Sequence, residues 1–172
     1  MALSPDQARR VYDRIGRLQD RQSFYEDPAI DDLVAASAFE EAASVVEVGC
    51  GTGRLAARLL GHHLPPDARY TAFDVSPTMT GLARDRLAPW AERAVVEVVD
   101  GSSPLPVGDG TADRFVATYV LDLLRGTDAA AAVGDAHRVL RPGGRLCVAG
   151  LTYGATLPAR IVERAWRAVW RR

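Results

Sequence analysis

The sequence predicts an α/β fold with a doubly wound, mostly parallel sheet, and two observations support this prediction. From residue 44 onward, short β-branched segments alternate with segments of helical periodicity, the order expected of parallel strands joined by helices. Residues 45–55 have the pattern of a strand that breaks into a glycine-rich turn and enters a helix. The valines of this strand suit a central position in the sheet, where helices cover both faces.

Each element has its own signal in the sequence. Five strands are predicted from apolar runs bounded by polar or turn residues, at 45–48, 70–73, 94–99, about 115–119 and 145–149. Ser76 and Pro77 are predicted to be the N-cap and first residue of a helix that runs to about Leu87. The next helix, about 127–140, is predicted to stop at the Arg-Pro-Gly-Gly sequence of residues 141–144.

Length and composition indicate a single domain spanning residues 1–172. Residues 1–42 are expected to form a helical N-terminal lid, residues 43–172 the α/β core, and residues 157–172 a last helix. The net charge of −1 gives no indication of nucleic-acid binding. We find neither a signal peptide nor an apolar run of the about 18 residues that a membrane span needs. The two cysteines make neither a disulfide framework nor a zinc site, so no metal is expected and a reducing cytoplasm fits best.

The glycine-rich turn predicts a ligand site. Gly49, Gly51 and Gly53 alternate with other residues, so a ligand can lie against bare backbone at the N-terminus of the following helix. This arrangement predicts a nucleotide-like cofactor at the carboxyl end of the first strand. A dinucleotide fingerprint would need a small residue at the last position, where Arg54 stands, so the spacing argues against NAD.

The turn resembles motif I of the class I S-adenosylmethionine (SAM) methyltransferases, a Rossmann-like family with the pattern E/D-x-G-x-G-x-G. Glu47, Gly49, Gly51 and Gly53 match that pattern. The turn at residues 138–146 and the order of the elements extend the resemblance over about residues 44–151. The resemblance implies SAM as cofactor and transfer of its methyl group to an acceptor, with release of S-adenosylhomocysteine.

Three acidic residues lie at or near the strand ends, where open α/β sheets bind ligands. Asp74 can accept hydrogen bonds from both ribose hydroxyls of an adenosine, or it can serve as a helix N-cap. The resemblance assigns the adenine amino group to Asp100, followed by Gly101; the alternative is a solvated loop aspartate. Glu47 is expected to orient the methionine end of SAM, a role compatible with an acid held by neighbouring N–H groups.

Further cofactor-binding residues come from the resemblance and from the neighbourhood of these motifs. Met79 is expected to pack on the adenosine, although a core methionine on a helix face is an alternative. Thr118 and Tyr119 are expected to line the methionine moiety and the methyl donor. Cys50 in the turn and Val75 after the second strand complete the expected set.

The N-terminal segment is similar to the lid of the small-molecule branch of this family, which includes ubiquinone/menaquinone and phospholipid N-methyltransferases. Tyr12 and Tyr25 are expected to line the pocket, since an aromatic face attracts a sulfonium; the alternative is packing of a helix onto the sheet. The resemblance implies a small acceptor, with lipidic and quinone-like molecules as candidates. No catalytic residue is assigned, although Asp122 could act as a base if the acceptor must lose a proton. The last helix carries tryptophans and arginines, and packing on the sheet is favoured over a membrane surface.

The family sheet has the order 3-2-1-4-5-7-6, and this chain leaves no residues for the two closing strands. We therefore expect either a fragment of a longer protein or an exposed edge at strand five, which a second copy could cover as a homodimer. A catalytically weakened SAM-binding or partner-binding module is an alternative function. An NAD-dependent oxidoreductase is a further one, which Arg54 opposes.

Overall fold

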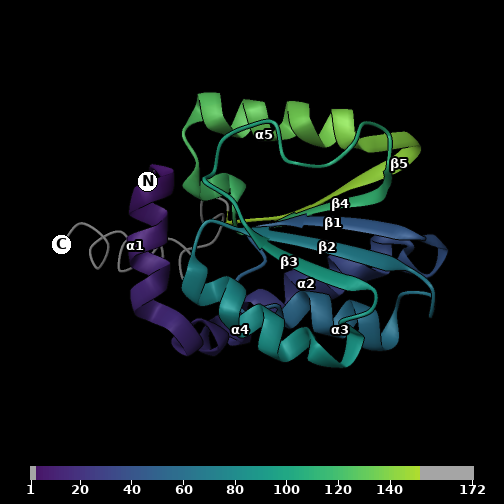
Figure 1. Ribbon diagram of the computed structural model, residues 1–172, viewed down its shortest axis with the longest axis horizontal. Helices are drawn as coiled ribbons and strands as arrows, with labels where there is room; N and C mark the ends of the chain where they lie inside the picture. The colour runs from purple at the N-terminus through teal and green to yellow at the C-terminus, as the bar shows by residue number, and fades with distance from the viewer. Residues whose placement is uncertain (1–2, 152–172) are drawn as a thin grey trace, which may run out of the picture.

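The computed structural model describes residues 3–151 and contains one parallel sheet in the order β3-β2-β1-β4-β5 (Figure 1). Its strands are β1 (Ser44–Val48), β2 (Arg69–Asp74), β3 (Ala94–Val98), β4 (Ala112–Thr118) and β5 (Leu140–Ala149). The predicted α/β fold is confirmed, with β1 at the centre of the sheet. The predicted last helix, 157–172, lies outside the described residues.

Helices cover both faces of the sheet. They are α1 (Pro5–Ile15), α2 (Ser23–Ser37), α3 (Arg54–His62), α4 (Pro77–Leu87) and α5 (Gly126–Val139). Figure 1 shows α5 on one face, the helices α2, α3 and α4 on the other, and α1 beside one end of the sheet. Short 3-10 helices that the sequence did not predict lie between these elements: η1 (Gly16–Gln22), η2 (Phe39–Glu41), η3 (Ala88–Trp90) and η4 (Leu121–Leu123).

The strands form because their apolar residues can be buried on both sides. Successive residues of β1 enter different clusters: Val45 packs with Phe39 and Leu59, whereas Val46 packs with Phe73 and Phe115. Every residue of β4 except its last is buried. Within residues 3–151, no helix is long and apolar enough to cross a membrane.

Two strands begin three or more residues before the predicted position, whereas the other boundaries agree to within one residue. The strand expected near residue 115 begins at Ala112, and the one expected at Arg145 begins at Leu140, directly after α5. Leu140 pairs with Ala112, and the ladder then shifts register before Arg114 pairs with Arg145. The Arg-Pro-Gly-Gly sequence therefore follows the end of the helix, as predicted, but lies within the strand that it was expected to precede.

Buried polar groups fasten the N-terminal helices to the sheet. The guanidinium of Arg114, which is 4% exposed, donates to the carbonyl oxygens of Ser37 and Ala38, each at 2.6 Å. These carbonyls lie at the end of α2, where the last C=O groups of a helix have no partner within it. The carboxylate of Asp113 accepts from the N–H groups of Ala43 and Ser44 at 2.8 and 2.9 Å.

Candidate cofactor and acceptor pocket

A cavity of about 930 Å³ opens at the carboxyl ends of the central strands. The glycine turn and the ends of β1, β2 and β4 form its floor, and residues of α1, η1 and α2 form the opposite wall. This edge is where open α/β sheets bind their ligands. The helical N-terminal segment therefore lies over the predicted cofactor site.

The three positions of the turn require glycine for different structural reasons. All three have a positive φ, with values of 70°, 53° and 75° at Gly49, Gly51 and Gly53. A Cβ at Gly49 would overlap the side chain of Val120, and one at Gly53 would lie 3.0 Å from the Cα of Ala83 in α4. A Cβ at Gly51 would meet nothing within 4 Å. Gly51 is thus the glycine whose missing side chain leaves room for a ligand.

Asp74 joins the turn to the end of β2. Its carboxylate accepts from the N–H of Gly51 and from the N–H of Ser76, both at 2.9 Å. The N-cap of α4 is Ser76, whose Oγ accepts from the N–H of Met79 at 3.1 Å, so Asp74 is not the cap. Burial raises the pKa of Asp74, and the two backbone donors oppose that shift.

Glu47 is buried beneath the turn and has a side-chain partner from β2. The hydroxyl of Tyr70 donates to its carboxylate at 2.9 Å. Burial raises the pKa of Glu47 to about 7; the bond from Tyr70 lowers it, and the nearby charge of Asp74 raises it. The predicted acid is therefore held by a side chain of β2 rather than by backbone N–H groups, a partner that sequence reasoning missed.

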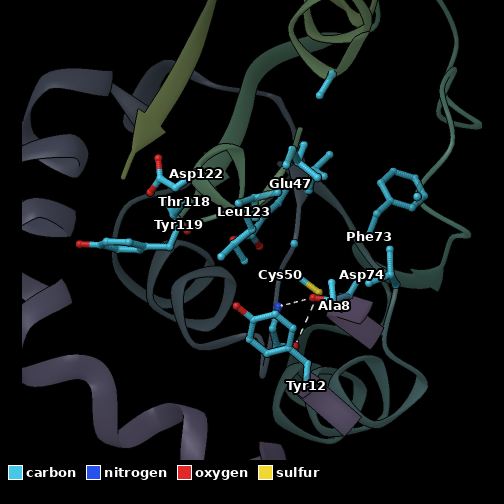
Figure 2. Close-up of a pocket in the computed structure, with 18 of the residues that line it drawn as sticks. Ala8, Tyr12, Glu47, Cys50, Phe73, Asp74, Thr118, Tyr119, Asp122 and Leu123 are labelled. Carbon is cyan, nitrogen blue, oxygen red and sulfur yellow. Dashed lines mark hydrogen bonds between the residues drawn. The ribbon is translucent and has the colours of Figure 1, made fainter. Parts of the chain in front are cut away.

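Aromatic side chains line the pocket from two sides. Tyr12 of α1 lies beside the glycine turn and Asp74 in Figure 2, and burial with the charges of Asp74 and Glu26 raises its pKa to about 12. Tyr119 follows β4 with φ at 57°, a strained value for a bulky residue, and its hydroxyl donates to the carbonyl oxygen of Glu26 at 3.4 Å. The side chain of Tyr25 lies outside the described part of the chain.

Most residues predicted to bind the cofactor line this cavity: Tyr12, Glu47, Gly49, Cys50, Gly51, Asp74, Val75, Gly101 and Thr118. Gly53 and Met79 do not, because Gly53 packs against α4 and Met79 is fully buried in the core. Asp100 is also absent from the lining. It is exposed, accepts from the N–H and Oγ of its neighbour Ser102 at 2.8 and 2.5 Å, and borders a smaller hollow beside α1.

The cationic side chains that line the pocket form ion pairs with acidic residues of α2. Among the lining residues that the structure describes, Arg54 and Arg58 are the two cations. Arg54 pairs with Asp27 at 2.6 Å, and Arg58 pairs with Asp31 at 2.6 Å, each across the junction of α3 and α2. The acidic residues at positions 26, 27 and 31 were the available sequence signal, but their partners could not be assigned without the fold.

The sequence profile described as "Methyltransferase domain" matches residues 45–144. A malonyl-[acyl-carrier protein] O-methyltransferase of Hahella chejuensis is 36% identical over 125 residues, which cover 73% of this chain and 41% of that protein. A demethylmenaquinone methyltransferase of Tropheryma whipplei is 29% identical over 170 residues, covering 92% of this chain and 63% of the relative. The chain thus spans less than two thirds of the length of these relatives.

The similarity of the fold to solved structures agrees with these sequence matches. The crystal structure of the [4+2]-cyclase SpnF superposes with a TM-score of 0.75 at 20% identity, covering 97% of this chain and 73% of that one. This likeness establishes the fold alone, since one fold hosts many activities. Because the domain profile matches more than half of the chain, over the glycine turn and the parallel sheet, the chain belongs to the class I SAM-dependent methyltransferase family.

Proposed function

We propose that this chain binds SAM across the glycine turn and transfers its methyl group to a small-molecule acceptor, releasing S-adenosylhomocysteine. The observation that carries the proposal is the open face of Gly51, whose N–H is fixed by Asp74 at the floor of the cavity. Family membership supports the cofactor assignment. The alternative, a module that binds SAM without turnover, predicts the same binding and no product.

The residues at the turn suit an adenosylated cation. In the proposal, the carboxylate of Asp74 holds the ribose, Gly51 leaves space for the amino-acid tail, and Tyr12 presents an aromatic face to positive charge. SAM supplies a methyl group that is already activated by the sulfonium. The chain then needs mainly to align donor and acceptor, which can contribute about 7–11 kcal/mol in the best cases. We propose no catalytic base; Asp122 lines the cavity, and its carboxylate accepts from the N–H of Leu151 at 2.5 Å.

We further propose that the acceptor is uncharged at the reacting end and largely apolar, as a quinone is. Two observations support this. Both arginines that line the described part of the pocket are paired with aspartates of α2, so neither is left for an acceptor carboxylate. Apolar side chains, among them Ile30, Leu123 and Leu124, contribute to the wall. The Tropheryma whipplei relative is named for a quinone substrate.

Calorimetric titration with SAM, S-adenosylhomocysteine and NAD tests the cofactor. We expect saturable binding of the first two and none of NAD; preferential binding of NAD would contradict the proposal. Product detection with neutral phenols and quinols, against carboxylates of similar size, then tests the acceptor. Binding without any product would favour the SAM-binding module.

Two further expectations concern the cellular location and the oligomeric state. We propose a cytoplasmic location, because the two cysteines, Cys50 and Cys147, are both buried free thiols. We also propose a homodimer that covers β5, since Leu146 and Val148 are 40% and 45% exposed there. Cell fractionation and sedimentation velocity test these two proposals.

A further inference from the structure

We propose that Asp20 is a positioning residue that couples closure of the N-terminal helices to the shape of the glycine turn, through a cluster with Thr52 and Arg86. This inference rests on the proposed function, because it concerns the same cofactor site. The three residues come from η1, the glycine turn and α4. They therefore join three segments that are far apart in the sequence.

The cluster is a closed set of hydrogen bonds. The hydroxyl of Thr52 donates to one carboxylate oxygen of Asp20 at 2.5 Å, and Arg86 donates to the other at 2.6 Å. The same guanidinium donates to the hydroxyl and the carbonyl oxygen of Thr52, at 2.6 and 3.1 Å. Each of the three side chains thus contacts both of the others.

The position of Thr52 makes these bonds matter for the cofactor. Thr52 is 4% exposed and lies between Gly51, the glycine open to the pocket, and Gly53, the N-cap of α3. Both neighbours have backbone conformations that little but glycine adopts. On the sheet side, Asp74 holds the N–H of Gly51; on the helix side, Asp20 and Arg86 hold Thr52. The turn is fixed between these two carboxylates.

The electrostatics favour a charged, closed cluster at neutral pH. Burial by itself would raise the pKa of Asp20, but the bonds from Arg86 and Thr52 outweigh it, so the pKa is lowered. Asp20 also lines the cavity. Because the carboxylate belongs to the N-terminal segment, the turn has this partner only when that segment is closed.

Such a linkage must be reciprocal. If closure of η1 favours the cofactor-binding form of the turn, a ligand on the turn favours closure of η1 by the same factor. Other contacts hold the N-terminal helices without touching the turn. The bond from the guanidinium of Arg145 in β5 to the carbonyl oxygen of Ala36 in α2, 3.2 Å long, is one of them, and Arg145→Met provides the control.

The test is titration of the full chain with S-adenosylhomocysteine, combined with hydrogen exchange of residues 16–22. We expect Asp20→Ala and Thr52→Val each to weaken binding by about tenfold. We expect the double variant to lose less affinity than the sum of the two single losses, because both single changes break the bond between Asp20 and Thr52. Arg145→Met, an exposed position outside the cavity lining, should stay within about twofold of the wild type. Ligand should slow exchange at residues 16–22 in the wild type and in Arg145→Met, but not in Asp20→Ala.

Three results would overturn the inference. Unchanged affinity with ligand-induced protection in Asp20→Ala would show that the cluster does not couple the two segments. Additive losses in the double variant would mean that Asp20 acts on the ligand itself. Failure of the wild type to bind would reject the proposed function and this inference with it. Should Asp20→Ala unfold, Thr52→Val, which keeps the side-chain volume, carries the comparison.

Discussion

The N–H of Gly51 donates to the carboxylate of Asp74 across 2.9 Å, so the glycine turn after β1 is fastened to the end of β2. The other carboxylate oxygen of Asp74 accepts from Ser76, at the start of α4. One buried acid therefore shapes two turns at the carboxyl edge of the sheet. Each of its oxygens retains acceptor capacity for a ligand hydroxyl.

Replacing Asp74 by Asn should weaken both the site and the fold. Hydrogen bonds to a charged group contribute about 1.5–3 kcal/mol each, so we expect S-adenosylhomocysteine to bind at least about tenfold less tightly. The melting temperature should fall as well, because an amide cannot accept equally from both backbone donors. Asp67→Asn, in the exposed turn before β2, is the control and should alter neither quantity. Normal affinity in Asp74→Asn would reject the ribose assignment.

Two alanine substitutions should distinguish the glycine that leaves space for a ligand from the glycine that packs against α4. Gly51→Ala places a methyl group in open space, so we expect a loss of about 1 kcal/mol of stability from its positive φ and a larger loss of ligand affinity. Gly53→Ala brings the same strain and a contact of 3.0 Å with the backbone of Ala83. It should cost more stability than Gly51→Ala. Thermal unfolding and titration calorimetry on both variants check this order, and the reverse order would contradict it.

The fold and the approximate location of the site could be predicted from the sequence, because both depend on local patterns. Strand and helix signals alternate along the chain, and Ser76 caps the helix at which it was predicted. Which glycine would leave open space beside it could not be predicted, since that depends on how closely α4 approaches the turn at Ala83. Met79 illustrates the same limit: its spacing fits a cofactor contact, but the packing of α4 on the sheet buries it completely.

The partners of the charged residues could not be predicted from the sequence either. Glu47 was recognised from its motif, whereas its hydrogen bond to Tyr70 follows from the register of β1 and β2. Asp20 carries no motif at all. It becomes part of the site only because η1 passes over the glycine turn, which is a long-range feature of the fold.

Arg114→Met should destabilise the chain more than loss of a surface arginine. The buried guanidinium satisfies the carbonyl oxygens of Ser37 and Ala38 at the end of α2, and these would lose their partners. Leaving buried acceptors unsatisfied costs about 1–3 kcal/mol each, so we expect the free energy of unfolding to fall by at least about 2 kcal/mol. Arg69→Met, at an exposed position in β2, should stay within about 0.5 kcal/mol of the wild type in urea unfolding. Equal effects of the two changes would show that Arg114 is not a structural anchor.

Glu47 should make stability depend on pH near neutrality. Its pKa is raised from 4.5 to about 7, so the folded chain favours the protonated form. The stabilisation is fully present below the ordinary pKa and is lost as pH rises through about 7. Glu47→Gln keeps an acceptor for Tyr70 and removes the charge. We expect its advantage in unfolding free energy over the wild type to grow between about pH 5 and pH 8, by on the order of 3 kcal/mol.

Tyr70→Phe should shift the pH at which titration of Glu47 changes the stability. Since the hydroxyl of Tyr70 lowers the pKa of Glu47, its removal should shift the midpoint of the pH dependence upward. A bound sulfonium should shift it downward, so the affinity for SAM should increase with pH in the wild type and stay flat in Glu47→Gln. Urea unfolding and calorimetry across this pH range check both shifts. A wild-type chain whose stability and SAM affinity are both constant from about pH 5 to pH 8 would show that Glu47 does not titrate there.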